Sequence, residues 1–299
     1  MIKYISGLAV ILIITFGFVL IKENKINKPQ TPDSGLKPAE SFSHSHGLAV
    51  DIEDSTKVYI ATHEGTYLLH NDKDLYRVGK TRDDLMGFTT HPKIPGIFFS
   101  SGHPARGGNI GFQKSEDGGL TWQKVSSGIG GPVDFHSLAL STANPNIAYG
   151  FYNGRLERSL DQGKTWEYAK GVIKPFALSA HPKKENTIYA ATEDGVKISE
   201  DGGDAWQDLS KDLLGGAVSV FSLNPSQPEH ALAFSQKLRG LAKSSDGGAT
   251  FAKIEETFSG ETVMYLSFSS SQPNIVYALT HANSIYKSED GGDTWKKVR

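Results

Sequence analysis

The ten histidines and three methionines carry the most distinctive chemistry of this sequence, which contains no cysteine. Imidazole nitrogen and thioether sulfur bind soft or borderline metal ions, and this pair of donors suits copper before zinc. Two aspartates, Asp84 and Asp134, stand two residues ahead of Met86 and His136. A carboxylate in that position can accept a hydrogen bond from an imidazole and orient the ring toward a metal ion. The residue types therefore predict a copper-type metal site, provided that the fold brings them together.

A stretch of eight residues recurs through the chain and defines the elements that would position these side chains. It reads Ser-x-Asp-x-Gly-x-Thr-aromatic, with one alanine in place of the threonine, and its copies start 40 to 45 residues apart. A fixed period in this range indicates a repeat architecture. An aspartate can accept backbone N–H bonds in a tight turn, and an aromatic side chain buries enough surface to hold that turn in place. We therefore expect a structural turn around each of the aspartates of the five clear copies, which are Asp117, Asp161, Asp201, Asp246 and Asp290.

These stretches resemble the Asp-box, or BNR repeat, of sialidase-like and sortilin-like β-propellers, and the resemblance covers residues 46–299. In that family the box is a turn between the third and fourth strands of a blade, remote from the active site. The resemblance implies a propeller fold. It leaves the function open, because the family includes glycoside hydrolases as well as protein-binding scaffolds.

The segments between the boxes predict short antiparallel strands. Alternating apolar residues, separated by turns rich in Pro, Asn and Gly, form six units of four strands. Such small sheets are stable when they stack on one another in a ring. We expect an all-β, six-bladed β-propeller of four-stranded antiparallel blades over residues 44–299, in which the last blade completes its own sheet.

The amino terminus predicts a membrane anchor. Tyr4–Ile21 contains no charged residue, is just long enough to span a bilayer, and lacks a signal cleavage site at its end. We expect residues 1–21 to form one transmembrane helix and residues 22–43 a flexible polar linker, with the propeller on the extracytoplasmic side of the cell membrane. Secretion after signal cleavage is the alternative. A net charge of −2 argues against a nucleic-acid partner, and we expect a monomer.

Alignment of the repeats places several histidines and methionines on one face of the propeller. The first strand of each blade is the innermost, and the loop between the second and third strands lies at the same face, opposite the boxes. We expect this mouth of the central channel to gather a set of metal ligands, namely His46, His63, Met86, His103, His136, Met264 and His281. His44 precedes His46 by two residues and would reach the same rim. The alternative is that the histidines are hydrogen-bonded core residues and the methionines fill gaps.

Hydrolysis of glycosides is the rival function. The Phe/Tyr-Arg-Ile-Pro motif of sialidases is absent, so a sialidase-like enzyme would depend on a pair of carboxylates at the same mouth, about 5 Å apart for retention or about 6.5–9.5 Å for inversion. The candidates are Glu64, Asp84, Asp134, Glu193 and Glu261. A protein-binding scaffold is the third possibility. Binding of a metal, a small molecule or a glycan at the mouth is the function that the sequence favours.

Overall fold

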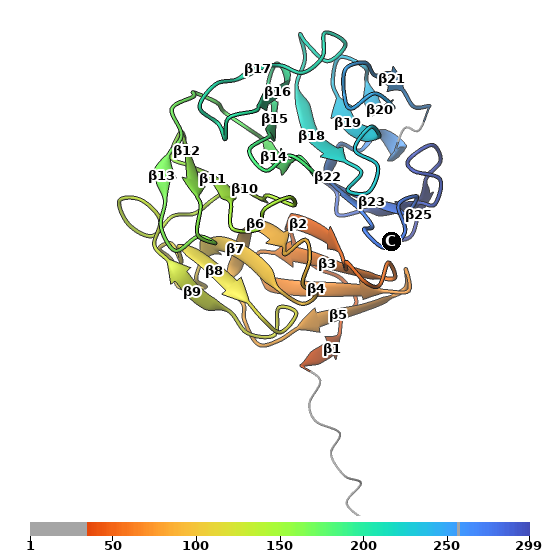
Figure 1. The fold of residues 1–299 in the computed structure, drawn as a ribbon. Coiled ribbons are helices and arrows are strands. Elements are labelled where there is room, and N and C mark those ends of the chain that lie inside the picture. The colour runs from red at the N-terminus through yellow and green to blue at the C-terminus, as the bar shows by residue number, and fades with distance from the viewer. Residues whose placement is uncertain (1–34, 256–257) are drawn as a thin grey trace, which may run out of the picture. The chain divides into compact units, whose positions relative to one another are not determined.

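Each repeat of the sequence folds into one antiparallel sheet, and the sheets are arranged around a central axis (Figure 1). The computed structural model describes residues 35–255 and 258–299, all within one compact unit from Gly35 to Arg299. Within these residues there are six sheets, and apart from the first strand, β1 (Leu36–Pro38), strands that follow one another along the chain are neighbours in each sheet. The expectation of a six-bladed β-propeller is therefore confirmed.

The strands of blades two to six follow one another in chain order from an inner first strand to an outer last strand, and in blade one the same order runs from β2 to β5 (Figure 1). The bounds for the first three blades are β1 (Leu36–Pro38), β2 (Ser45–Val50), β3 (Lys57–Thr62), β4 (Gly65–His70) and β5 (Asp74–Val78); β6 (Asp84–Thr90), β7 (Phe98–His103), β8 (Phe112–Ser115) and β9 (Gln123–Ser126); and β10 (Ser137–Leu140), β11 (Ala148–Tyr152), β12 (Arg155–Ser159) and β13 (Glu167–Tyr168).

The last three blades are built in the same way, and one short 3₁₀ helix precedes the sixth. Their bounds are β14 (Ala177–Ala180), β15 (Ile188–Thr192), β16 (Gly195–Ser199) and β17 (Gln207–Asp208); β18 (Val218–Leu223), β19 (Ala231–Ser235), β20 (Gly240–Ser244) and β21 (Ala252–Lys253); and η1 (Phe258–Gly260), β22 (Val263–Phe268), β23 (Val276–Thr280), β24 (Ile285–Ser288) and β25 (Lys296–Lys297).

The hydrophobic core lies between the blades. Among the described residues it consists of six clusters, and each cluster combines side chains of two adjacent blades. Tyr277 of blade six, for example, packs with Ile60 and Leu69 of blade one. Since a single small sheet cannot bury both of its faces, these contacts are what makes the ring stable.

The recurrent turns join the third and fourth strands of a blade, as expected. In the second blade, Asp117 accepts hydrogen bonds from the hydroxyl of Ser115 (2.8 Å) and from the backbone N–H of Thr121 (2.9 Å). The same serine–aspartate hydrogen bond occurs at Asp161, Asp201, Asp246 and Asp290. The aromatic residue of the turn packs at the interface with the preceding blade, as Trp122 does beside Phe88.

The first blade differs from the expected four strands, because β1 pairs with the outer edge of β5 and makes this sheet five-stranded. The compact unit thus begins at Gly35, inside the segment 22–43 that the sequence analysis assigned to a flexible linker. A proline is tolerated in a strand of this kind, since Pro38 lies at the sheet edge, where no ladder N–H is needed. Among residues 35–255 and 258–299, the sixth blade consists of four consecutive strands and ends with its own strand β25.

No helix among the described residues is long and apolar enough to cross a membrane. The expected transmembrane segment Tyr4–Ile21, together with residues 22–34 of the expected linker, lies outside the described residues.

Candidate functional site

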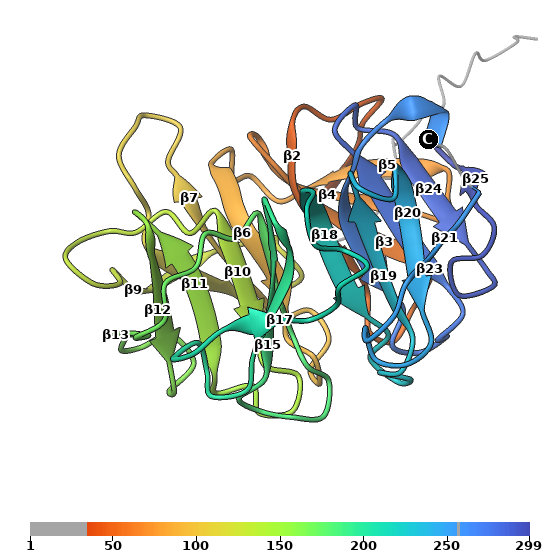
Figure 2. The ribbon, with the colours of Figure 1, turned by 90° about the horizontal axis from the view of Figure 1, so that it is seen from above.

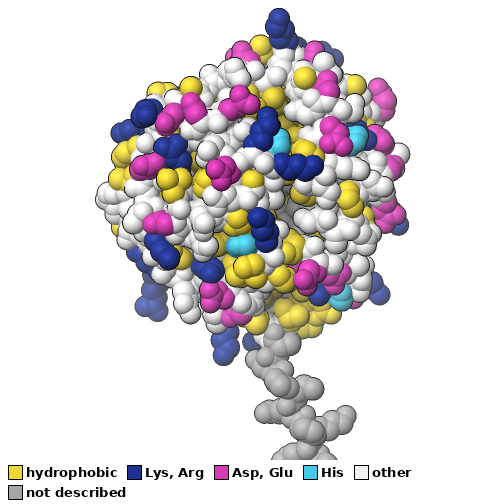
Figure 3. Space-filling model, in the orientation of Figure 1, with side chains coloured by type: hydrophobic (Ala, Val, Ile, Leu, Met, Phe, Trp, Pro, Cys, Tyr) yellow, Lys and Arg dark blue, Asp and Glu magenta, His cyan; other side chains and the backbone are white. Residues whose placement is uncertain are grey.

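A pocket of about 640 Å³ opens at one mouth of the central channel. Its lining includes every side chain that the repeat alignment assigned to this mouth, namely His46, His63, Met86, His103, His136, Met264 and His281. The start of β2 and the loop between β7 and β8 lie at this edge of the propeller, the upper one in Figure 2. Figure 3 shows the opposite face, where imidazoles are scattered among Lys and Arg side chains around the central hollow. The clustering of histidines is therefore a property of one face.

β-Bulges set the direction of several of these side chains. The pairing of β2 with β3 shifts between Ser45 and Gly47, which leaves His46 in the bulge. The corresponding shift in the sixth blade leaves Met264 in a bulge between Val263 and Tyr265. A bulge inserts an extra residue and re-aims its side chain. In blades one and six, the bulge near the start of the inner strand directs His46 and Met264 toward the mouth.

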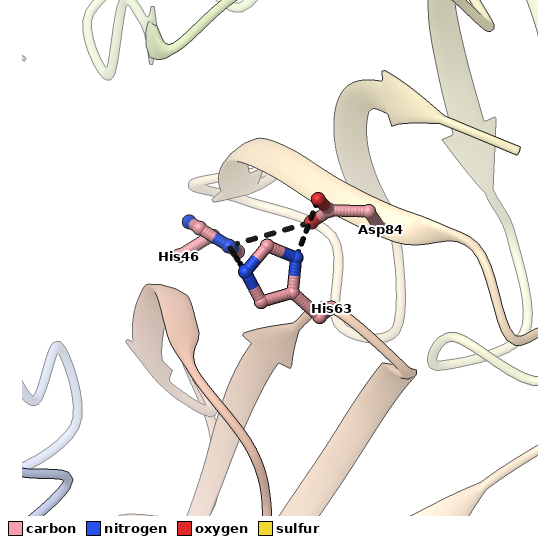
Figure 4. Close-up of side chains that lie close together, drawn as sticks. All are labelled: His46, His63 and Asp84. Carbon is pink, nitrogen blue, oxygen red and sulfur yellow. Dashed lines mark hydrogen bonds and ion pairs between the residues drawn. The ribbon is translucent and has the colours of Figure 1, made fainter. Parts of the chain in front are cut away.

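His46, His63 and Asp84 converge in this pocket (Figure 4). Nε2 of His46 lies 3.3 Å from Nε2 of His63 and 3.4 Å from Oδ1 of Asp84. Nδ1 of His63 lies 2.6 Å from Oδ2 of Asp84. Within residues 35–255 and 258–299, this is the one group of three potential ligand residues whose ligand atoms all lie within 4.8 Å of one another. It joins the inner strand of blade one, the loop after β3 and the first residue of β6.

The hydrogen bonds and burial of the group leave nitrogen lone pairs inside it. Because a carboxylate only accepts hydrogen bonds, Nδ1 of His63 donates to Asp84 and Nε2 keeps its lone pair. Burial lowers the pKa of His46 to about 4; Asp84 opposes this effect, and the surrounding imidazoles add to it. The side chain of His46 is only 12% exposed. At neutral pH, His46 is therefore an uncharged imidazole directed at a second imidazole.

His44 extends the group at the rim, although the sequence analysis did not include it among the ligands. Its ring centroid lies 5.5 Å from that of His46 and 5.2 Å from that of His63. The signal that identifies it is the His-x-His pattern at 44 and 46 just ahead of an inner strand.

A second aspartate, Asp134, holds two further histidines. Its Oδ2 lies 2.8 Å from Nε2 of His103 and 2.8 Å from Nε2 of His136. The other ring nitrogen of His103 lies 2.9 Å from the carbonyl oxygen of Gly108. This hydrogen bond raises the pKa of His103; burial lowers it, and the negative charge of Asp134 raises it further. The sequence analysis placed all three residues at the mouth, but it paired Asp134 with His136 alone.

The remaining expected ligands line the pocket without joining either group of imidazoles and carboxylate. Met86 is buried, whereas Met264 is partly exposed. His281 is exposed, and its Nδ1 accepts a hydrogen bond from the backbone N–H of Thr262, which fixes the loop after β23. Among the residues that the sequence analysis named as metal ligands, His46 and His63 are thus the two whose ring nitrogens lie close enough together to bind one ion.

The three candidate glutamates occupy other environments. Glu64 forms an ion pair with Arg77 at 3.2 Å. Glu261 accepts hydrogen bonds from the hydroxyls of Thr280 and Ser284, and the former in particular lowers the pKa of this carboxyl group. Glu193 is exposed. The carboxylates that meet imidazoles at the mouth are therefore the aspartates.

The comparisons with known proteins identify the fold. Neither protein-family models nor curated protein sequences match this chain. Its structure resembles an ancestral GH74 enzyme with a TM-score of 0.60 and 14% identity, covering 88% of this chain and 47% of the enzyme. The GH74 xyloglucanase from Xanthomonas campestris gives a TM-score of 0.55 and 15% identity, over 84% and 47% of the two chains.

YCF48 from Cyanidioschyzon merolae is similar over most of its length, with a TM-score of 0.55 and 14% identity, covering 88% of each chain. This chain spans about half the length of the GH74 enzymes that it matches, since it covers 47% of each. At identities of 14–15%, the likeness shows a β-propeller fold, and the chemistry of the mouth has to be argued from its own residues.

Proposed function

We propose that this propeller binds a divalent transition-metal ion at its mouth through His46, His63 and Asp84. The observation that supports the proposal most directly is the spacing of the ligand atoms, with 3.3 Å between the two Nε2 atoms and 3.4 Å from His46 to Asp84. Two atoms that bind a tetrahedral ion through bonds of about 2.0–2.1 Å lie about 3.3 Å apart. An ion could therefore bind His46, His63 and Asp84 with little change in these two distances.

The environment of the group also favours a cation. Without a metal ion, the two facing Nε2 atoms share one hydrogen in a hydrogen bond between the rings, and an ion that binds both atoms takes the place of that hydrogen. His46 needs no deprotonation at neutral pH, because its pKa lies near 4 as a result of burial. The carboxylate of Asp84 supplies negative charge and, through the Nδ1–H of His63, holds that ring in the orientation typical of a metal ligand.

Three protein ligands leave a coordination position open toward the pocket of about 640 Å³. Structural ions usually have four protein ligands, whereas ions that exchange or react keep an open position. The geometry thus supports a role in holding or handling metal rather than in stabilising the fold. Copper is the first candidate, since Cu²⁺ has the highest affinity for nitrogen and oxygen donors among the divalent first-row ions. A location at the outer face of a membrane remains a proposal from the apolar segment Tyr4–Ile21.

Metal titration of the full-length chain tests the proposal. The metal-free protein is titrated calorimetrically with Cu²⁺ and with Zn²⁺, and the ion content is measured after desalting. We expect stoichiometric binding by the wild type and loss of the tightest-binding ion in His46→Ala/His63→Ala. The control is His70→Ala, because His70 lies at the other end of β4 from His63, about 20 Å along the strand. Equal binding by the double variant and the wild type would reject the site.

Hydrolysis of glycosides is the second candidate function. The observation in its favour is that Asp84 and Asp134 both contact histidines at the mouth of a propeller whose fold resembles that of GH74 enzymes. Incubation with xyloglucan and with aryl glycosides, in the presence and absence of metal, tests it. Release of sugar that Asp84→Asn and Asp134→Asn both abolish would establish catalysis at these carboxylates.

A further inference from the structure

A second cleft opens beside the pocket at the mouth, where the loops of blade five meet blades four and six. Its volume is about 650 Å³, and it is lined by the mouth ends of β18, β19, β20 and β22. Phe176, which precedes β14, and Met264 line both this cleft and the mouth pocket. We infer that the cleft binds a small apolar molecule that carries one carboxylate, and that the carboxylate binds to Arg239. This ligand site is separate from the proposed metal site.

The lining of the cleft is mostly apolar. Phe176 is 55% exposed, and Phe234 and Met264 are partly exposed. The hydroxyl of Ser219 is already used, because it donates to the carbonyl oxygen of Val263 at 2.6 Å. Clefts of about 300–1,000 Å³ that are lined in this way are typical of small-molecule sites, where a few polar groups fix the orientation of the ligand. The cleft thus favours an apolar body that covers the exposed ring of Phe176.

Arg239 supplies the charge that fixes such a ligand. Among the described residues that line the cleft, it is the one that carries a charge, and its guanidinium has no hydrogen-bond or ion-pair partner within residues 35–255 and 258–299. A guanidinium presents its N–H donors in a planar fork that matches the two oxygens of a carboxylate. Gln236 of the same loop also lines the cleft, so its side-chain amide is a second donor for this group.

The loop between β19 and β20 holds Arg239 in an unusual backbone conformation. Its φ is 57°, in the left-handed region, which Asn153 and Asn283 occupy in the corresponding loops of blades three and six. Asparagine is enriched there because its short polar side chain can form local hydrogen bonds, whereas arginine has no such compensation. Leu238 anchors the loop, since it packs against the hydrophobic cluster between blades four and five. Backbone strain that the surrounding structure maintains is typical of binding sites.

Two probes that differ only in the head group test the inference, 1-pyrenebutanoate and 1-pyrenebutanol. Each is titrated with the full-length chain, and the fluorescence of pyrene measures binding. The buffer contains EDTA, so that the carboxylate cannot bind to the protein through a metal ion. We expect the wild type to bind the carboxylate about tenfold or more tightly than the alcohol, because only the carboxylate forms charge-assisted hydrogen bonds with Arg239.

Four variants locate the two parts of the probe. Arg239→Gln should remove the preference for the carboxylate and leave the affinity for the alcohol unchanged. Arg106→Gln is the matched control, because it removes an exposed arginine from the loop between β7 and β8 at the same face, and it should keep the preference. Phe176→Ala, at a side chain that is largely exposed, should weaken both probes to a similar degree. His46→Ala/His63→Ala should bind both probes as the wild type does.

The outcomes are independent of the metal titration. Absence of saturable binding of 1-pyrenebutanoate to the wild type would overturn the ligand site, and so would equal affinities for the two probes. A preference that Arg239→Gln retains would overturn the role of this arginine, and the same loss of preference in Arg106→Gln would show attraction by the charge of the whole face instead. Unchanged binding of both probes by Phe176→Ala would exclude this cleft as their site.

Discussion

Asp84 and His103 face each other as register partners on β6 and β7, and this pairing connects the two groups of imidazoles at the mouth. Asp84 accepts a hydrogen bond from His63 on one side, at 2.6 Å. His103 contacts Asp134 on the other, at 2.8 Å. The antiparallel pairing of the two strands thus holds one residue of each group at a fixed separation.

The first prediction concerns Asp84→Asn, which removes the charge of the carboxylate and keeps its shape. We expect the affinity of the proposed His46/His63/Asp84 site for its metal ion to fall about 10- to 100-fold or more. The variant weakens one ligand and also the hydrogen bond that orients His63. Calorimetric titration with Cu²⁺ or Zn²⁺ measures the effect. Asp83→Asn is the matched control, since Asp83 accepts a backbone hydrogen bond from Ala105. Unchanged affinity in Asp84→Asn would exclude this carboxylate as a ligand.

The second prediction concerns Glu157, a buried carboxyl group of β12. Burial raises the pKa of Glu157 to about 7, against the lowering effect of a hydrogen bond from the backbone N–H of Ile129. The folded state therefore keeps a proton that the unfolded state loses between pH about 4.5 and 7, so this group lowers stability as pH rises through that window. We expect Glu157→Gln to be more stable than the wild type at pH 8, by on the order of 2 kcal/mol, and nearly equal to it at pH 4.5.

Denaturant unfolding at several pH values measures this difference. Other groups titrate in the same window, but they are common to both proteins and cancel in the comparison. A stability difference that does not change between pH 4.5 and 8 would show that Glu157 does not keep its proton on folding.

The third prediction concerns the recurrent turn at Asp290. Burial tends to raise the pKa of Asp290, but hydrogen bonds from Thr294 and Ser288 outweigh it and lower this pKa to about 2. The stabilisation is therefore present above pH about 4 and is lost as pH falls toward 2. We expect Asp290→Asn to lower stability by about 1–2 kcal/mol at pH 7 and much less near pH 2. Glu289→Gln, an exposed neighbour in the same turn, should have little effect.

The fold was predictable because one repeated turn marks the position of each of blades two to six. The serine–aspartate hydrogen bonds of that turn are local, so a short sequence motif specifies them without knowledge of the rest of the structure. The alignment of repeats then assigned histidines to faces. His91 and His181 instead lie in the turns between the first and second strands of their blades, where the Nδ1 of each accepts backbone N–H bonds, and His91 is buried there.

The pairing of particular side chains was not predictable in the same way. His103 lies at the start of the longer loop of the second blade, which has no counterpart in the other repeats, so its contact with Asp134 could not be aligned. Strand β1 escaped prediction because its three residues pair with β5, and no clear copy of the recurrent turn precedes that strand. Both features depend on contacts between segments that are distant in the chain.

The last prediction concerns the contact between the first and last blades. Asp72, in the turn between β4 and β5 of blade one, accepts hydrogen bonds from the hydroxyl of Tyr277 (2.5 Å) and from Nζ of Lys287 (2.9 Å) in blade six. Asp72→Ala leaves the buried hydroxyl of Tyr277 with a weak contact to Ser55 and removes one partner of Lys287. We expect a loss of about 2–3 kcal/mol in the free energy of unfolding.

A double-mutant cycle with Tyr277→Phe separates this interaction from the general effect of each substitution. The phenylalanine keeps the packing of the ring in the cluster between blades one and six and removes only the hydroxyl. If Asp72 and Tyr277 close the ring together, their coupling energy should reach about 1–2 kcal/mol, and Asp72→Ala should cost less in the Tyr277→Phe background. Asp74→Ala, two residues along in an exposed position, should cost little in either background. Strict additivity of the two substitutions would show that the hydrogen bond between Tyr277 and Asp72 does not help to close the ring.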